Sequence, residues 1–137
     1  MKVIVICTGN SCRSQMAEGL IKNKYPNFEV SSAGSHPEES VNPYAVKVMH
    51  DIGIDISQNV PKNVNKFVDD EFDYVFTVCD SAVKICPVFN NAKNKVHKSF
   101  VDPKRDSYDS EDHAIEIYTE TRNLIEEWIN EYEDIWS

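Results

Sequence analysis

The 137-residue sequence contains no apolar run close to the roughly 20 residues that span a membrane. Its opening stretch, MKVIVICTGN, has a short apolar segment but no small-residue cleavage site after it, which argues against a signal peptide. With four glycines and six prolines, the sequence shows no repeat, linker or low-complexity segment. We therefore expect a single cytoplasmic domain spanning residues 1–137, with no membrane partner.

Basic side chains are in the minority, with 14 Lys and Arg against 23 Asp and Glu and a net charge of −9. Residues 1–68 carry seven basic and six acidic side chains, whereas residues 69–137 carry seven and 17. An acidic surface repels the phosphates of nucleic acid, so we do not expect nucleic acid as a partner. The acidic half is either a well-solvated helix face or a docking surface for a partner protein. We expect the chain to be a monomer.

Cysteines are few, and there are four of them: Cys7, Cys12, Cys79 and Cys86. In a cytoplasmic chain, thiols with redox, catalytic or packing roles are more common than a structural disulfide framework. A zinc site is not indicated, because the stretch CDSAVKIC has no Cys-x2-Cys spacing and no neighbouring histidine. The thiols themselves are therefore the first candidates for chemistry.

The first half of the chain predicts alternating strands and helices. The β-branched run at 2–6 is typical of a strand buried on both faces. Helical spacing of apolar residues follows at 13–25. A second strand at 28–34 precedes a second helix at 41–53, which ends at its glycine.

The second half continues the alternation. Residues 54–71 are irregular, with a short helix at 63–67, and a strand follows at 74–78. A segment at 80–92, whose type the pattern leaves open, precedes a fourth strand at 95–99. The closing helix has an apolar stripe made of Ala114, Ile117, Tyr118, Leu124, Ile125, Trp128, Ile129 and Tyr132. The alternation predicts an α/β fold, an open, mainly parallel four-stranded sheet with helices on both faces. Such sheets bind ligands beyond the carboxyl ends of their strands.

The stretch CTGNSCRS connects the first strand to the first helix. Cys7 ends the strand and Arg13 opens the helix. A glycine-bearing loop that runs into a helix N-terminus directs several peptide N–H groups at one point and binds an oxyanion. The same field and the Arg13 guanidinium favour a thiolate, so we expect a lowered pKa and a nucleophilic role for Cys7. The predicted oxyanion-binding residues are Thr8, Gly9, Asn10, Ser11, Cys12, Arg13 and Ser14.

Two loop residues support the nucleophile. Asn10 tolerates a left-handed backbone, and Ser14 is placed to donate its hydroxyl to the sulfur of Cys7. The alternative is that Cys7 and Cys12 are only buried packing residues, which free cysteines often are.

The other two cysteines lie after the third strand. Cys79 directly follows YVFTV, and a parallel sheet places the end of this strand at the same edge as Cys7. Cys86 follows seven residues later, which in a helix is a rise of roughly 10 Å. A disulfide needs Cα atoms within about 7 Å, so a Cys79–Cys86 bridge requires the segment to unwind. The alternative is two core thiols at chance spacing.

CTGNSCRSQMAEG (7–19) resembles the loop of the thioredoxin-coupled arsenate reductases, which share the low-molecular-weight tyrosine phosphatase fold. Phosphatases of this fold more often have proline where Gln15 stands. The resemblance continues at SAG (32–34), VNP (41–43), GIDIS (53–57) and DP (102–103), and it covers essentially the whole chain.

The resemblance implies a relay of sulfur displacements. Cys7 attacks arsenate held by the loop and Arg13, while Asp102 protonates the departing oxygen. Cys79 attacks the Cys7 sulfur and releases arsenite, and Cys86 then attacks Cys79. Thioredoxin, an external reductant, restores the dithiol, and no tightly bound cofactor is expected.

Several assignments have alternatives. The alternative to a general-acid role for Asp102 is that it is an ordinary turn aspartate, and Asp106 is a second candidate acid. Lys104 stands where phosphatases often carry an aromatic residue, which weakens the case for an aryl phosphate pocket. Cys12 either packs or forms a protective bridge with Cys7.

Relatives that hold a potassium ion match this chain at Asn10, Glu18 and Ser32. Lys62 stands where a further carboxylate is expected, and an ammonium there would replace the ion. We therefore predict no bound metal.

Two competing functions remain at this point. One is a low-molecular-weight protein-tyrosine phosphatase that uses Cys7, Arg13 and Asp102. The other is an oxyanion-binding or redox-sensing module without turnover.

Overall fold

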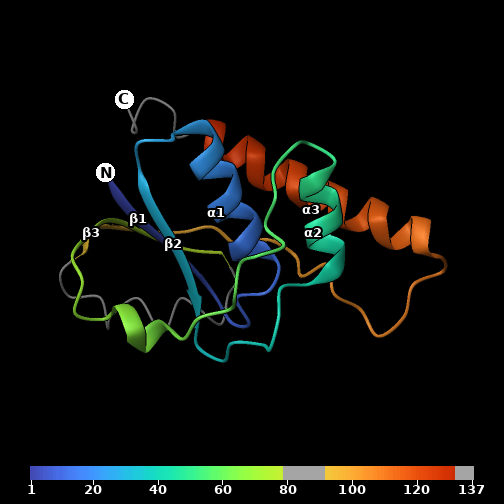
Figure 1. Cartoon of the computed structure of the whole chain (residues 1–137), viewed down its shortest axis with the longest axis horizontal. Coiled ribbons are helices and arrows are strands. Elements are labelled where there is room, and N and C mark those ends of the chain that lie inside the picture. The colour runs from blue at the N-terminus through green and yellow to red at the C-terminus, as the bar shows by residue number, and fades with distance from the viewer. Residues whose placement is uncertain (79–91, 132–137) are drawn as a thin grey trace.

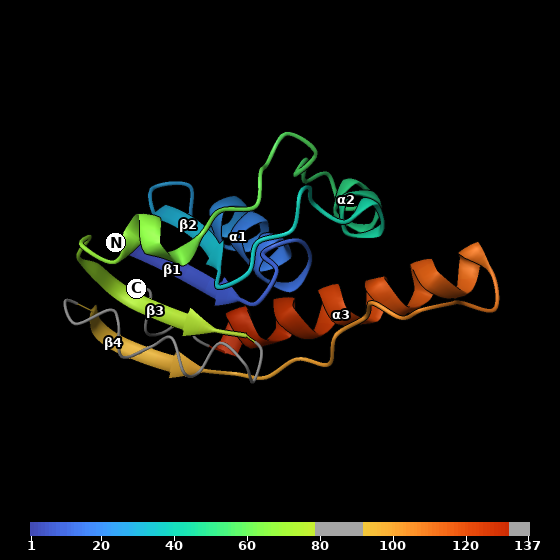
Figure 2. The same ribbon diagram turned by 90° about the horizontal axis from the view of Figure 1, so that it is seen from below.

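The computed structural model describes residues 1–78 and 92–131. Its sheet has four strands in the order β2-β1-β3-β4, with every neighbouring pair parallel. The strands are β1 (Lys2–Cys7), β2 (Glu29–Gly34), β3 (Phe72–Thr77) and β4 (Ala92–His97). Figure 2 shows the arrowheads of β1, β3 and β4 directed the same way. The predicted parallel four-stranded sheet is confirmed.

Helices flank this sheet. They are α1 (Arg13–Lys24), α2 (Pro43–His50), α3 (Glu111–Glu131) and the 3-10 helix η1 (Val64–Phe67). Figure 1 shows α1 and α3 on one side of the strands and η1 on the other. The arrangement follows from right-handed crossovers, because β2 lies on one side of β1 and β3 on the other. The core therefore lies between the sheet and the pair α1 and α3, which contact each other.

The first strand confirms the reading of its β-branched run. Val3, Ile4, Val5 and Ile6 are all 0% exposed, as expected for a central parallel strand covered on both faces. Aromatic rings extend this core toward the last helix, where Trp128 packs edge-on against Phe76.

The second helix is shorter than the predicted 41–53. The Asn42 side chain caps it by accepting from the N–H groups of residues 44 and 45. At the other end, the N–H of Ile54 bonds the carbonyl of Met49 and that of Gly53 bonds the carbonyl of residue 50. This pair of bonds, with Gly53 at φ 80°, is a Schellman motif. The glycine does end the helix, but the motif moves the last helical residue back to His50.

The last helix begins three residues before the start of the predicted apolar stripe. Ser110 accepts from the N–H of His113 and caps it. The buried residues of α3 are Ala114, Tyr118, Thr121, Ile125, Trp128 and Ile129. Leu124, which the sequence placed in the apolar stripe, does not belong to the buried face, because its side chain is 53% exposed. Position 124 lies off the line of positions 114, 118, 121, 125 and 128, which follows the 3.6-residue period.

The boundaries of the third and fourth strands differ by one to three residues from the prediction. The third strand covers 72–77 instead of 74–78, and the fourth covers 92–97 instead of 95–99. Both start earlier because strand pairing, which begins at Phe72↔Ala92, extends the strands through polar residues. Within the described residues, no helix is long and apolar enough to cross a membrane.

Candidate active site

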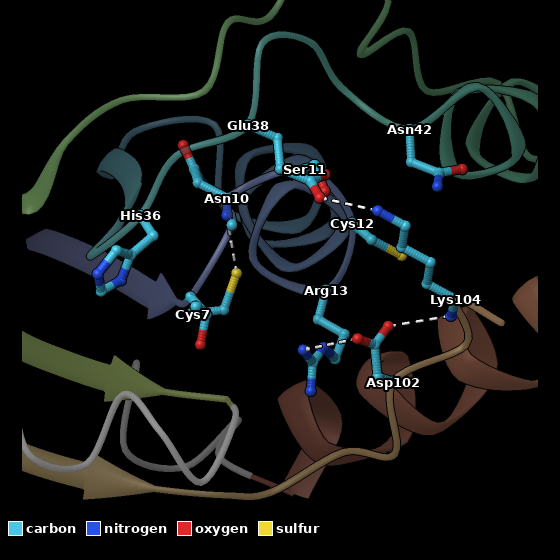
Figure 3. Close-up of a pocket in the computed structure, with 12 residues that line it drawn as sticks. Cys7, Asn10, Ser11, Cys12, Arg13, His36, Glu38, Asn42, Asp102 and Lys104 are labelled. Carbon is cyan, nitrogen blue, oxygen red and sulfur yellow. Dashed lines mark hydrogen bonds and ion pairs between the residues drawn. The ribbon is translucent and has the colours of Figure 1, made fainter. Parts of the chain in front are cut away.

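A pocket of about 260 Å³ opens at the carboxyl edge of the sheet, between β1 and α1 (Figure 3). Most of the predicted oxyanion loop lines it. The lining residues are Cys7, Thr8, Gly9, Asn10, Ser11, Cys12, Arg13, His36, Glu38, Asn42, Asp102 and Lys104. Ser14 is fully buried behind the loop instead. The loop and the acid of the DP motif, 95 positions apart in sequence between Cys7 and Asp102, thus meet in one cavity.

Hydrogen bonds converge on the sulfur of Cys7. The peptide N–H of Asn10 donates to it at 3.2 Å, and the hydroxyl oxygen of Ser14 lies 2.9 Å away. Since that hydroxyl accepts from the Asn10 amide, its own hydrogen is left to donate to the sulfur. Donors directed at a sulfur stabilise negative charge on it. The predicted support by Ser14 is confirmed in its geometry, and the nucleophilic role of Cys7 stays a prediction.

Asn10 fixes the back of the loop. It is 0% exposed and its φ is 49°, which confirms the expected left-handed backbone. Its Nδ2 donates to the hydroxyls of Ser14 (2.8 Å) and Ser32 (2.9 Å). Its Oδ1 accepts from the peptide N–H of Lys62 (2.9 Å) and from the Gln15 amide (3.2 Å). One buried amide therefore ties the loop to α1, to β2 and to the segment before η1.

Of the other residues matched to a potassium site, Ser32 bonds to the Asn10 amide, whereas Glu18 bonds to residues of α1 and of the segment before η1. Glu18 is buried and accepts from Lys22 (3.1 Å) and Asn59 (3.4 Å). The ammonium of Lys62 donates to the carbonyl of Val60 at 3.0 Å. Burial lowers the pKa of Lys62, and the charge of Glu18 opposes this shift. Lys62 reaches the Asn10 side chain through its peptide N–H, so replacement of an ion by its ammonium stays a prediction.

Gly34 permits the loop to approach β2. A Cβ at this position would lie 2.4 Å from the carbonyl oxygen of Thr8, far inside van der Waals contact. The glycine that ends the SAG stretch is therefore required by close contact between two backbones.

Arg13 and Asp102 meet at the side of the pocket. A guanidinium nitrogen of Arg13 lies 3.5 Å from the Asp102 carboxylate, and another donates to the carbonyl of Phe100 at 3.0 Å. The Arg13 side chain is 13% exposed and that of Asp102 is 52% exposed. Asp102 also accepts from the N–H of Lys104 at 3.0 Å, an interaction that orients its carboxylate. The second candidate acid, Asp106, is exposed and does not line this pocket.

Cys12 lies in the pocket wall without a disulfide to Cys7. Burial is the largest cause that raises the pKa of the Cys12 thiol, and the negative charge of Asp102 is the next. Cys12 therefore stays a neutral thiol over a wider pH range than an exposed cysteine.

Two charged residues at the mouth were not predicted as site residues. The ammonium of Lys104 lies 2.9 Å from the Glu38 carboxylate. A hydrogen bond from the Ser11 hydroxyl, followed by the one from Lys104, lowers the pKa of Glu38. The same carboxylate raises the pKa of Lys104. The sequence did mark Lys104, by its place after the DP motif, but it gave no signal for Glu38.

Cys79 and Cys86 lie outside the described residues. The chain that leads to them is described as far as Val78, whose N–H donates to the carbonyl of Ile6 at 3.0 Å. The third strand therefore ends beside β1, next to Cys7, as the sequence predicted. Contact among the three cysteines stays a prediction.

Cys7 lies below the loop, with Arg13 and Asp102 beside it in one pocket, which is the arrangement expected of an enzyme that attacks tetrahedral oxyanions with a thiolate. Residues 2–134 match the family model described as low molecular weight phosphotyrosine protein phosphatase. The chain belongs to this family, as its resemblance indicated.

Known relatives point to one branch of the family. An arsenate reductase of Halalkalibacterium halodurans is 43% identical over 116 residues, which cover 82% of each chain. A solved structure described as an arsenate reductase in the phosphate binding state is 29% identical, with a TM-score of 0.75 over 95% of this chain and 94% of that one. A tyrosine phosphatase of Erwinia amylovora has a TM-score of 0.74 at 21% identity, over 94% of this chain and 91% of that one, and it shows the shared fold alone.

Proposed function

We propose that this protein reduces arsenate to arsenite. The observation that carries the proposal is the Cys7 sulfur, which accepts hydrogen bonds from the loop at the base of a pocket that also holds Arg13 and Asp102. The arsenate reductase that is 43% identical to this chain supports arsenate as the oxyanion. We infer a cytoplasmic monomer that uses thioredoxin as its external reductant and needs no tightly bound cofactor.

In the first step, the thiolate of Cys7 attacks arsenic. An As–S bond forms while the bond from arsenic to a hydroxyl group breaks, and the departing hydroxyl takes the proton of the Asp102 carboxylic acid and leaves as water. The peptide N–H groups of residues 8–14 and the guanidinium of Arg13 hold the remaining oxygens and stabilise their charge.

Reduction follows in a thiol relay. The thiolate of Cys79 attacks the sulfur of Cys7, the S–As bond breaks, and its electron pair stays on arsenic, which leaves as arsenite. Cys86 then attacks Cys79, which releases the thiolate of Cys7 and leaves a Cys79–Cys86 disulfide. The dithiol of thioredoxin reduces this disulfide and is itself oxidised.

The test is arsenite production from arsenate with thioredoxin, thioredoxin reductase and NADPH. We expect sustained turnover in the wild type and none in Cys7→Ser, Cys79→Ser or Cys86→Ser. Cys12→Ser is the thiol control, because the predicted oxyanion-binding role of this residue uses its peptide N–H, which the substitution keeps, and the relay does not use its sulfur; it should keep turnover. Mass spectrometry of Cys86→Ser should find a Cys7–Cys79 disulfide. Turnover that survives loss of Cys79 would contradict the relay.

A tyrosine phosphatase remains the second candidate, because Cys7, Arg13 and Asp102 are the three groups such an enzyme needs and they meet in one pocket. It predicts hydrolysis of aryl phosphates that requires Cys7 and is unaffected by Cys79→Ser or Cys86→Ser. We expect only residual activity of this kind. Fast aryl phosphate hydrolysis without arsenite production in the wild type would favour the phosphatase.

A further inference from the structure

Four charged side chains surround the mouth of the pocket. The guanidinium of Arg13 lies 3.5 Å from Asp102, whose other carboxylate oxygen accepts the N–H of Lys104 at 3.0 Å. The Lys104 ammonium lies 2.9 Å from Glu38, and the peptide N–H of Glu38 donates to the carbonyl of Gly9 at 2.9 Å. Figure 3 shows Lys104 extending from the segment of Asp102 across the pocket to Glu38.

Glu38 and Lys104, the last pair of these four charged side chains, come from two segments that are far apart in sequence. Glu38 lies between β2 and α2, and Lys104 lies between β4 and α3. Their side chains are 40% and 59% exposed. Exposed ion pairs contribute little net free energy, because water solvates both partners well when they separate. Lys104 can therefore leave Glu38 at small cost when another anion arrives.

An oxyanion in the pocket presents one oxygen to the four charged side chains at the mouth. Attack by Cys7 requires the departing oxygen to lie opposite the sulfur, and the loop lies around the sulfur. The departing oxygen therefore points out of the loop, toward Asp102 and the mouth. In free arsenate or phosphate this oxygen is unsubstituted, whereas in an aryl ester it carries a ring.

In the part of the chain that the structure describes, the mouth has the chemistry for an unsubstituted oxygen and has no apolar wall for an aromatic ring. Among the pocket-lining residues of segments 1–78 and 92–131, there is no Phe, Tyr, Trp, Leu, Ile or Val side chain. An aromatic ring at this point would contact two charged groups without satisfying either, which costs free energy of desolvation. An ammonium, in contrast, forms a charge-assisted hydrogen bond to an anionic oxygen.

We propose that Lys104 binds the outward oxygen of a free inorganic oxyanion, that Glu38 holds Lys104 over the empty pocket, and that this pair selects free oxyanions against aryl esters. The proposal rests on the proposed function, because it names the substrate class of that same site. Glu38 competes with the oxyanion for one ammonium, so the two residues have opposite effects on affinity. Lys104 favours the anion, and the carboxylate of Glu38 opposes it.

The experiment is titration calorimetry of the reduced protein with two probes, inorganic phosphate and phenylphosphonate. Phenylphosphonate carries its ring at the outward position and is not hydrolysed, so binding is measured without turnover. The variants are Lys104→Met and Glu38→Gln. Lys93→Met is the matched control, because Lys93 pairs with Asp73 at 3.2 Å in an exposed ion pair at the opposite edge of the sheet.

We expect Lys104→Met to weaken phosphate binding about fivefold, the upper range for one exposed charge pair, and to change phenylphosphonate binding less than twofold. Glu38→Gln should strengthen phosphate binding about two- to fivefold, because it removes the competing anion. Lys93→Met should change neither affinity by more than about twofold, since its charge is distant and screened.

Equal losses for both probes in Lys104→Met would overturn the proposal, because they would indicate a general charge effect. Unchanged or weaker phosphate binding in Glu38→Gln would overturn it independently, even if Lys104→Met failed to fold. These affinities do not depend on whether arsenate is reduced. A protein that shows the expected shifts without making arsenite would retain this inference while the proposed function fails, and the reverse result would reject the inference alone.

Discussion

Replacement of Asn10 tests how much of the loop depends on one buried amide. In Asn10→Ala, the hydroxyls of Ser14 and Ser32 lose their donor, but they can rotate toward other partners. The N–H of Lys62 loses its acceptor outright. A buried group left without a partner costs about 1–3 kcal/mol, and a left-handed alanine adds about 1–2 kcal/mol. We expect the free energy of unfolding to fall by about 2–5 kcal/mol, a large part of the 5–15 kcal/mol typical of a domain.

Asn10→Gly separates the two causes. It removes the same amide but adopts a φ of 49° without steric cost, so it should be more stable than Asn10→Ala by about 1 kcal/mol. Asn94→Ala is the control, because its exposed amide donates one hydrogen bond to the carbonyl of Asp73, and it should change stability by less than about 0.5 kcal/mol. Urea unfolding under reducing conditions measures all three. An Asn10→Ala loss below about 1 kcal/mol, or a glycine variant less stable than the alanine variant, would refute the reasoning.

Three further predictions concern residues that line the pocket or support its lining. Gly34→Ala should destabilise the fold by about 1–3 kcal/mol and weaken phosphate binding, because its Cβ would meet the backbone of Thr8 at 2.4 Å. In Gly9→Ala the new Cβ meets only the flexible Glu38 side chain, at 3.2 Å. A thermal melt should therefore show a smaller drop in melting temperature for Gly9→Ala than for Gly34→Ala. The Tyr108 hydroxyl donates to the carbonyl of Pro103 at 2.8 Å and accepts from the N–H of Arg105 at 3.1 Å, and so positions the segment that carries Asp102. Tyr108→Phe should therefore lower kcat by a larger factor than it lowers phosphate affinity. A kcat equal to that of the wild type would contradict this positioning role. Burial raises the pKa of the Cys12 thiol in the folded protein. The contribution of this thiol to folding stability is therefore present below its pKa in the unfolded chain and is lost as pH rises through its pKa in the folded protein. Treatment with iodoacetamide at pH 8 followed by peptide mapping should find Cys12 unmodified, whereas rapid labelling would contradict its neutral, buried state.

The inner part of the site could be predicted from sequence because it is encoded locally. One stretch of eight residues supplies the sulfur, the peptide N–H groups and the arginine, and the left-handed position of Asn10 follows from residue type. The residue pattern likewise predicted every described strand and helix, with shifted boundaries. The apolar stripe included Leu124, which is exposed, because the sequence gives the angle of a residue around the helix but not how wide a face tertiary packing buries.

The mouth could not be predicted in the same way. Glu38 and Lys104 meet only because the loops after β2 and β4 return to the same edge of the sheet. Their pairing depends on tertiary geometry: Lys104 follows the DP motif, but no local pattern links it to Glu38. Asp102 was found through its resemblance to a family motif, and the hydroxyl of Tyr108 behind it had no sequence signal at all.

The charges around the pocket also determine how an anion is attracted to an acidic protein. Besides His36, the described lining residues contain two cations, Arg13 and Lys104, and two anions, Glu38 and Asp102. These four charges cancel, and the thiolate expected at Cys7 repels an anion. The net attraction must therefore come from the peptide N–H groups of the loop and the N-terminus of α1, which are close to the anion and act over a short range. Salt screens distant charges much more than such contacts. We therefore expect the Kd for phosphate to change less than about threefold between 50 and 500 mM sodium chloride. A tenfold or greater weakening would mean that free side-chain charge, and not the loop, supplies most of the affinity.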